Sequence, residues 1–221
     1  MTPSDLDLDE LARITYSAVF SDVCDQLGLR HQTLAPNIAP VVGLPEGATL
    51  IGWARTARSI AVDAPPERHY GAEIDFIDSL AAGDLVIADC SEAPAAFWGE
   101  LFSTAAAARG ARGAVVDGLI RDHDRIARLG FPVFATGHRP TDSLGRVSID
   151  VVDVPISVGG VTVASSDLIV ADHDGVVVVP ASCARAVADR AAAKASTESD
   201  AQRMLRSGAM LREAWERFRV L

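Results

Sequence analysis

The chain has 221 residues, of which 49% are hydrophobic, and this is enough apolar material for one sizeable core. Aromatic residues make up only 5%, so the core is mainly aliphatic, which favours an α/β fold with strands covered on both faces. The formal net charge of −10, without any basic run, excludes a surface that tracks the phosphates of nucleic acid or of an anionic membrane.

The first 82 residues predict two short helices, then an extended segment, then a third helix. Apolar residues recur at helical spacing from Leu11 to Leu27, which predicts two short helices, with Ser21 as the candidate N-cap of the second. Thr49 to Val62 alternates and is β-branched, which predicts a strand pair or one bent strand. A helix is expected from Glu67 to Ala82, and Gly83 closes it.

The middle of the chain alternates between strands and helices. Short apolar runs predict buried strands, and the helices between them end at glycines, as left-handed caps require. The expected strands are 84–89, 113–117 and 131–135, and the expected helices are 100–109 and 122–129.

The C-terminal part predicts β structure followed by a helical arm. Val147 to Val163 alternates as antiparallel strands with Gly159-Gly160 as a hairpin turn. Two further strands are expected at 167–171 and 175–179, and we interpret the acidic residues Asp172 and Asp174 between them as a turn rather than a second metal loop. A long Ala-rich helix follows from about residue 182, with a break near Ser196–Ser199.

The cysteines and the N-terminus indicate the compartment. Cys24, Cys90 and Cys183 are odd in number, lie far apart and form no C-x-x-C motif, so we interpret them as reduced thiols. Met1 to Glu10 is acidic and lacks the apolar segment of a secretory signal, and no apolar run reaches membrane-spanning length. The sequence therefore predicts a cytoplasmic protein with no nucleic-acid and no membrane partner.

Two of the expected helices begin with an acid. Glu100 follows Gly99, and Asp122 follows Arg121, each at the carboxyl side of a strand, where α/β proteins collect ligands. First-turn acids commonly do no more than complement the helix dipole. An arginine fork beside an acid favours a site, because the fork suits a substrate carboxylate while the acid holds a hard cation. Gly99 and Gly118 are expected to allow close approach of the backbone.

Other chemistry-bearing residues have simpler interpretations. The histidines lack metal-ligand spacing, so each is expected to be a surface or hydrogen-bonding residue, although His123 follows Asp122 and could reach the site. Lys194 is the single lysine of the chain and is expected to point to solvent from an Ala-rich helix. Schiff-base chemistry, which needs a lysine, is therefore not expected.

Several runs resemble those of a known family. Gly99 to Gly110, Gly113 to Asp122, Gly130 to Phe134 and Asp172 to Pro180 resemble the RraA-like superfamily over most of the chain. That superfamily contains 4-hydroxy-4-methyl-2-oxoglutarate aldolases, which also decarboxylate oxaloacetate, and regulators of ribonuclease E activity. The resemblance implies one layered β/β/α domain over residues 1–221, of the swivelling, phosphohistidine-domain-like type, with a central mixed sheet flanked by helices and a C-terminal helical arm at about 182–221.

The resemblance also implies the roles of residues. Asp122 would bind Mg²⁺ or Mn²⁺ directly, and Glu100 would bind the metal through water. Arg121 would hold the carboxylate and keto oxygen of a 2-oxo acid. The segment from Gly99 to Phe102 would bind the substrate, with the backbone N–H groups of Leu101 and Phe102 receiving the pyruvate carboxylate.

Two further acids would come from a neighbouring subunit. The resemblance implies that Asp22 and Glu198 complete the site and that one of them acts as the base, with Glu213 and Glu216 as alternatives for Glu198. A site shared in this way implies a homotrimer or a dimer of trimers (a homohexamer) with active sites at the subunit interfaces.

The expected function is that of a divalent-metal-dependent lyase, an aldolase and decarboxylase. It would cleave a 4-hydroxy-2-oxo acid by retro-aldol reaction to pyruvate, or decarboxylate oxaloacetate, through a metal-stabilised pyruvate enolate. Two alternatives stay open. One is a non-enzymatic regulator that binds ribonuclease E or another protein, and the other is a related metal-dependent lyase for a different oxo acid or sugar acid.

Overall fold

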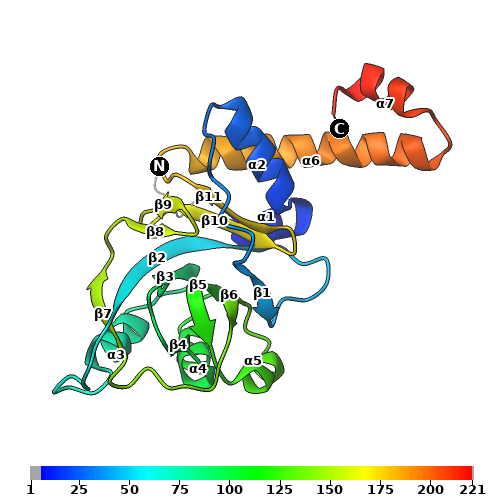
Figure 1. Ribbon diagram of the computed structural model, residues 1–221. Helices are drawn as coiled ribbons and strands as arrows, with labels where there is room; N and C mark the ends of the chain where they lie inside the picture. Colours follow the sequence, from blue (N-terminus) through cyan, green and yellow to red (C-terminus); the bar gives the residue numbers. More distant parts are fainter. Residues whose placement is uncertain (1–5, 221) are drawn as a thin grey trace.

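Nine of the described strands form one large, curled, mixed sheet with helices on both sides, and two more strands pair as a separate antiparallel hairpin (Figure 1). The computed structural model describes residues 6–220. The expectations for Met1 to Glu10 and for a domain over 1–221 reach into residues 1–5 and 221, which lie outside the described part. The expected fold class, a mixed α/β fold with a central sheet flanked by helices, is confirmed.

The strand order is β1-β6-β5-β3-β2-β10-β11, with β4 added beside β5 and β7 beside β2. The pairs that join β2, β3, β5 and β6 are parallel, whereas β1, β7, β10 and β11 run antiparallel to their neighbours. The strands are β1 (Ala39–Val42), β2 (Leu50–Ala61), β3 (Asp84–Asp89), β4 (Ala96–Trp98), β5 (Gly113–Ile120), β6 (Val133–His138), β7 (Val147–Val152), β8 (Ile156–Val158), β9 (Val161–Val163), β10 (Leu168–Asp172) and β11 (Gly175–Val179). The helices are α1 (Leu8–Ile14), α2 (Ser17–Gln26), α3 (Gly71–Asp78), α4 (Glu100–Ala108), α5 (His123–Leu129), α6 (Ala184–Arg206) and α7 (Leu211–Phe218).

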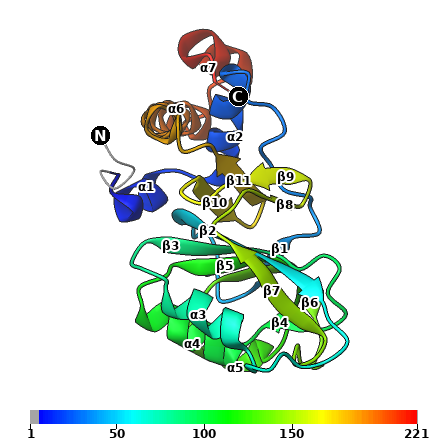
Figure 2. The same cartoon turned by 90° about the vertical axis from the view of Figure 1, so that its left-hand side faces the viewer.

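Alternation along the strands divides the core into layers. On β3, Val86 and Ala88 pack in the cluster that contains α3, α4 and α5, while Leu85 and Ile87 pack on the opposite face, against residues of β10 and β11. The outer faces of β10 and β11 are covered by α1, α2 and α6. Figure 2 shows the resulting stack, with α3, α4 and α5 at one end of the molecule and α2 and α6 at the other.

Some boundaries differ from the expected ones because distant contacts cap the helices. Ser21 is not an N-cap but lies inside α2, whose first residue, Ser17, donates its backbone N–H and its hydroxyl to the carboxylate of Asp172 at 2.7 Å each. This confirms the structural role of Asp172. Helix α3 is shorter than Glu67–Ala82, because Tyr70 has a left-handed backbone with φ of 54° directly before it.

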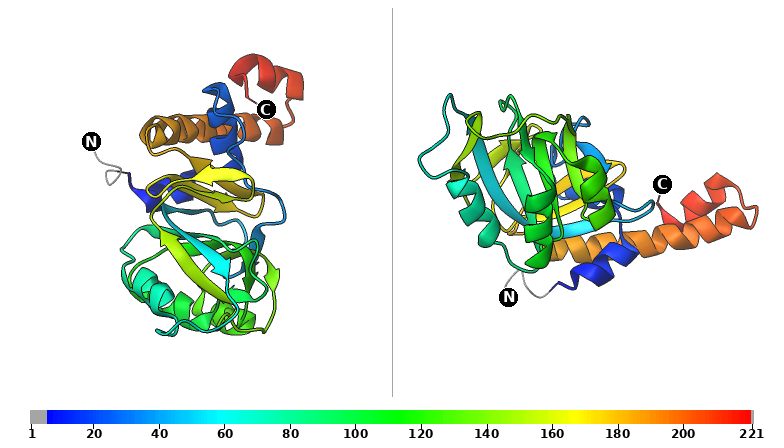
Figure 3. Two further views of the ribbon diagram at one scale, coloured as in Figure 1. Left: turned by 60° about the vertical axis from the view of Figure 1, so that its left-hand side comes forward. Right: turned by 90° about the horizontal axis from the view of Figure 1, so that it is seen from below.

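Helix α6 is unbroken, so the expected break near Ser196–Ser199 is wrong. The hydroxyls of Thr197 and Ser199 donate to carbonyl oxygens four residues earlier and are satisfied within the helix. The chain turns only after Arg206, at Gly208, and α6 with α7 extends past the edge of the sheet (Figure 3). Within residues 6–220, no helix combines the length and apolarity needed to cross a membrane.

Candidate functional site

Two parallel strands bring the three polar residues of the expected site together. β4 ends at Trp98, which pairs with Ile120 at the end of β5, so Gly99 and Arg121 leave the sheet at the same edge. Helix α4 begins at Glu100 and α5 begins after Asp122. Glu100, Arg121 and Asp122 consequently line one cavity of about 560 Å³.

Asp122 directs its carboxylate away from its own helix. The residue precedes α5 with a left-handed φ of 62°, and its side chain makes no capping hydrogen bond there. Instead, Oδ2 accepts the backbone N–H of Glu100 at 3.2 Å and lies 3.7 Å from Nε of Arg121. The carboxylate is therefore held between the two helix starts, on the cavity wall.

Gly99 makes room for this carboxylate. A Cβ at position 99 would lie 2.8 Å from Oδ2 of Asp122 and 3.3 Å from Cγ of Arg121. The backbone of Gly99 therefore lies close to side chains of the site. The backbone of Gly118 lies close to the main chain of Cys90, because a Cβ at position 118 would be 2.9 Å from the Cys90 carbonyl oxygen. The expected role of both glycines is confirmed.

We expect Gly99→Ala to weaken activity without unfolding the protein. The backbone at residue 99 is extended, so alanine fits its φ and ψ, but the added methyl group must displace the Asp122 carboxylate. We predict a loss of about tenfold in kcat/KM for the expected decarboxylation of oxaloacetate, with an unchanged melting temperature by circular dichroism. Wild-type kinetics in the variant would show that the position of this carboxylate does not matter.

Arg121 is held by groups from two other segments, and a third segment supports one of them. Its backbone N–H donates to the carbonyl oxygen of Trp98 at 2.9 Å, and its Nη1 lies 3.1 Å from Oδ1 of Asp142. Tyr70 donates its hydroxyl to the other oxygen of Asp142 at 2.6 Å. The guanidinium is thereby oriented along the cavity, beside Asp122.

The same contacts set the acidity of Tyr70 and Asp142. Burial, followed by the hydrogen bond to Asp142, raises the pKa of Tyr70 to about 12. Burial alone would raise the pKa of Asp142, but the Tyr70 hydrogen bond and the Arg121 charge outweigh it and hold that pKa below its usual range. Asp142 is therefore ionised beside Arg121 at neutral pH.

We expect Tyr70→Phe to raise the pKa of Asp142, as followed by NMR titration of its carboxyl carbon. A depressed carboxyl pKa stabilises the fold above the unfolded-state value of about 3.9, and this contribution is lost as the pH falls through the folded-state pKa. The variant should thus be less stable than wild type at pH 7, and the difference should shrink below about pH 3.9. Tyr16→Phe, at the other tyrosine of the chain, is the control. An Asp142 titration unaltered by Tyr70→Phe would contradict this coupling.

Helix α4 offers polar groups at its start. The N–H groups of a first helical turn lack acceptors within the helix, and Gly99 has no side chain to cap them. Glu100 donates its own N–H to Asp122, so those of Leu101 and Phe102 come next along the cavity wall. The Glu100 side chain has Oε2 3.6 Å from Nη1 of Arg125.

The residues of this site fit a hydrated hard cation. Within residues 6–220, no group of three or more His, Cys, Asp or Glu side chains could hold a metal on its own. Mg²⁺ and Mn²⁺ accept oxygen ligands, and Mg²⁺ usually keeps several waters while binding one or two carboxylates and the substrate. Asp122, with a carboxylate held on the cavity wall and Glu100 beside it, matches that donor set.

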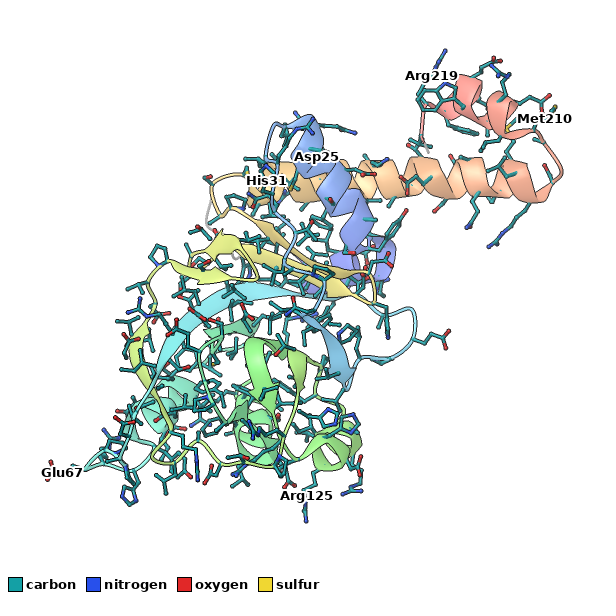
Figure 4. All side chains as sticks on the ribbon, viewed as in Figure 1. Asp25, His31, Glu67, Arg125, Met210 and Arg219 are labelled. Carbon is teal, nitrogen blue, oxygen red and sulfur yellow. The ribbon has the colours of Figure 1, made fainter. Side chains whose placement is uncertain are left out.

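Asp22 and Glu198 lie elsewhere in the chain. They belong to α2 and α6, on the opposite side of the sheet from α4 and α5 (Figure 1). Figure 4 shows the same separation through Asp25 on α2 and Arg125 on α5, which lie at opposite ends of the molecule. A single chain therefore does not bring these two acids to the cavity.

Lys194 does not point to solvent, as the sequence suggested. Its side chain is only 13% exposed, with Nζ 2.8 Å from Glu198 and 3.2 Å from Asp22. Tyr16 donates a further hydrogen bond to Glu198. Burial alone would lower the pKa of Lys194, but both acids outweigh it and raise that pKa, so the amine stays protonated and unsuited to a Schiff base.

Two residues that contribute to the cavity, Tyr70 and Asp142, were not predicted from the sequence. Tyr70 and Asp142 lie outside the helices and strands, in loops where no local motif distinguishes them. His123 bonds through Nε2 to the carbonyl oxygen of Val41 at 2.9 Å and through Nδ1 to Asp124 at 3.0 Å. Both ring nitrogens are thus engaged. His123 does not line the cavity that contains Glu100 and Arg121, but it lines an adjoining cavity that shares Asp122 with it.

Comparison with known proteins adds independent information. The family model described as "RraA-like: Aldolase/RraA" matches residues 18–178. The chain is 29% identical to a Halalkalibacterium halodurans protein named "Putative 4-hydroxy-4-methyl-2-oxoglutarate aldolase", over 97% of this chain and 96% of that one. It is also 29% identical to protein DlpA of Legionella pneumophila, over 90% of this chain but only 32% of that longer protein.

A solved structure shows the same fold. The crystal structure of Streptomyces coelicolor RraAS2, described as "an unusual member of the RNase ES inhibitor RraA protein family", superposes with a TM-score of 0.73. The two chains are 30% identical, and the match covers 87% of this chain and 96% of RraAS2.

Proposed function

The chain belongs to the RraA-like family, and on that premise we propose that it is a divalent-metal-dependent lyase that releases pyruvate from a 2-oxo acid. Its substrates would be 4-hydroxy-2-oxo acids, cleaved by a retro-aldol reaction, and oxaloacetate, which would lose CO2. The observation that carries this proposal is the placement of the Asp122 carboxylate and the Arg121 guanidinium on one cavity wall, beside the start of α4.

Mg²⁺ or Mn²⁺ held by Asp122, and by Glu100 through water, would supply Lewis-acid stabilisation of negative charge on the keto oxygen. Arg121 binds the keto acid and shares that charge, and the N–H groups of Leu101 and Phe102 orient the carboxylate. These groups of the chain fix the plane of the keto acid, so that the bond from C3 to C4 can align with the carbonyl π system.

The two reactions share one intermediate. In the retro-aldol direction, a base takes the proton of the C4 hydroxyl, the C3–C4 bond breaks, and C4 becomes a carbonyl group while its bonding pair forms the enolate of pyruvate. Oxaloacetate yields the same enolate when its C4 carboxylate leaves as CO2, and this step needs no base. Protonation at C3 then gives pyruvate in both cases.

The base would come from a neighbouring subunit. Asp22 and Glu198 lie far from Asp122 within one chain, so a homotrimer or a dimer of trimers in which α2 and α6 of one copy approach the cavity of the next would complete the site. Mixing Asp122→Asn chains with Glu198→Gln chains should then restore part of the retro-aldol activity that each lacks. No recovery on mixing would contradict a shared site.

Metal removal tests the proposed function directly. We expect oxaloacetate and 4-hydroxy-4-methyl-2-oxoglutarate to yield pyruvate when Mg²⁺ or Mn²⁺ is present, as measured by coupling to lactate dehydrogenase. Excess chelator should abolish both reactions, and added metal should restore them. Equal rates with and without chelator would contradict the proposal.

A second candidate function is binding to a protein partner, as the description of Streptomyces coelicolor RraAS2 suggests for that relative. The net charge of −10 favours a basic partner. Absence of pyruvate formation with every metal and substrate, together with inhibition of a ribonuclease E-type enzyme, would favour this candidate.

A further inference from the structure

The cavity beside Asp122 is larger than a three-carbon keto acid needs. At about 560 Å³ it falls in the range of roughly 300–1,000 Å³ that holds drug-sized ligands. Glu100, Arg121 and Asp122 contribute its polar groups on one wall, whereas the rest of the lining is mostly apolar. The remaining space is available to the part of the substrate beyond C3.

The apolar wall is preformed. Phe97 and Ile77 are buried, and Phe102 packs edge-on against Phe97 and Trp98, with ring centroids 6.3 Å and 5.7 Å apart. Ile74 on α3 is 45% exposed and extends the wall towards solvent. Rings locked by one another keep a fixed shape, which favours an alkyl or aryl group of matching form.

The charges on this lining oppose a second carboxylate. Of the described residues that line the cavity, Arg121 is the only basic one, and it already faces Asp142 and Asp122. Acidic side chains line the cavity at Asp78, Glu100, Asp122 and Asp142. A carboxylate at the far end of the substrate would be desolvated against aromatic rings and near like charges, which is unfavourable.

We propose that the preferred substrate is a 4-hydroxy-2-oxo acid with a single carboxylate and an apolar group on C4. This inference rests on the proposed lyase function and specifies its substrate class. Cleavage of the C3–C4 bond releases pyruvate and an aliphatic or aromatic aldehyde, with the C4 hydroxyl proton passing to the base and the C3 carbanion taking a proton. Substrates with a second carboxylate, such as 4-hydroxy-4-methyl-2-oxoglutarate, are cleaved more slowly.

Steady-state kinetics with Mg²⁺ compare 4-hydroxy-2-oxo-4-phenylbutanoate with 4-hydroxy-4-methyl-2-oxoglutarate. We expect kcat/KM to favour the phenyl substrate by about tenfold or more. Calorimetry supplies a readout without turnover, because 4-methyl-2-oxopentanoate and 2-oxoglutarate carry no C4 hydroxyl to cleave. We expect 4-methyl-2-oxopentanoate to bind more tightly than 2-oxoglutarate by a similar factor. Equal or reversed preferences in both the kinetics and the calorimetry would overturn the inference.

Two matched variants test whether the apolar wall causes the preference for the substrate with a single carboxylate. Ile74→Arg places a cation in the apolar wall and should reduce or reverse both ratios, because it supplies a partner for the second carboxylate. Ile60→Arg is the control, since Ile60 is also 45% exposed but lies on β2 and is not among the described residues that line the cavity. If both variants altered the kcat/KM ratio and the affinity ratio equally, the apolar preference could not be assigned to the wall that contains Ile74.

Exchange of the C3 protons of pyruvate separates the two proposals. Enolate formation exchanges them for deuterium whatever the group beyond C3, and NMR follows the loss of the methyl signal. Exchange without any apolar preference would overturn the substrate inference and leave the lyase proposal standing. Absence of exchange, together with absence of oxaloacetate decarboxylation, would overturn both.

Discussion

Replacing Asp122 with Asn is expected to lower kcat/KM for oxaloacetate by about 10³-fold, the largest effect of any substitution considered. The change removes the anionic oxygen that would hold the cation while keeping the size of the side chain. Asparagine tolerates the left-handed backbone with φ of 62°, so the fold should be retained. The measurement is pyruvate formation across a Mn²⁺ titration.

Asp124→Asn is the matched control. Asp124 lies two residues along the chain with an 88% exposed side chain that bonds to His123. It lines an adjoining cavity with Asp122 but not the cavity that contains Glu100 and Arg121. It should keep wild-type activity, and both variants should melt like the wild type. Binding of Mn²⁺ followed by electron paramagnetic resonance should weaken only in Asp122→Asn. Undiminished activity in that variant would refute the assignment of the metal ligand.

Arg121→Gln is expected to lower kcat/KM for oxaloacetate by about 10²-fold to 10³-fold through loss of the charge that would hold the keto acid. Glutamine can donate one hydrogen bond but carries no charge, so Asp142 also loses its ionic partner. Arg121→Lys should recover only part of the activity, since an ammonium group cannot reproduce the planar fork. Initial rates over a range of oxaloacetate concentrations separate the KM and kcat effects.

Arg128→Gln serves as the control for this change. Arg128 is exposed on α5 and is not among the described residues that line the cavity, so its loss should leave both kinetic constants unchanged. A similar loss in Arg121→Gln and Arg128→Gln would indicate a general effect of positive charge near the site, and would contradict a direct role for the Arg121 fork.

The centre of the candidate site could be predicted because it depends on local patterns. The run from Asp84 to Asp89 and the start of α4 at Glu100 fall where the apolar periodicity and the flanking glycines place them. Residues that follow adjacent parallel strands meet at the same edge of a sheet, which led us to expect Glu100 near Asp122. The strand that brings Glu100 there is β4, which the sequence did not predict and which pairs with β5. The proximity of Arg121 and Asp122 to Glu100 follows from this rule.

The features that the sequence did not predict depend on contacts between segments that lie far apart in the chain. Ser17 begins α2 because a carboxylate 155 positions later accepts its N–H, and no local signal reveals that partner. Tyr70 reaches Asp142 across 72 positions, from a loop that lacks a motif. Lys194 looked solvent-exposed in an Ala-rich helix, yet α2 supplies Asp22 to bury it. In each case tertiary packing decided what the local sequence left open.

The left-handed backbone at residue 122 restricts how this position can evolve. Asp, Asn and Gly tolerate such a φ, whereas a β-branched residue would strain the turn before α5. Codons for Asn and Gly each differ from an Asp codon by one base. A descendant of this protein could thus lose the proposed metal ligand in one mutational step and retain its architecture, which offers a route from the proposed enzyme to a binding protein within one lineage.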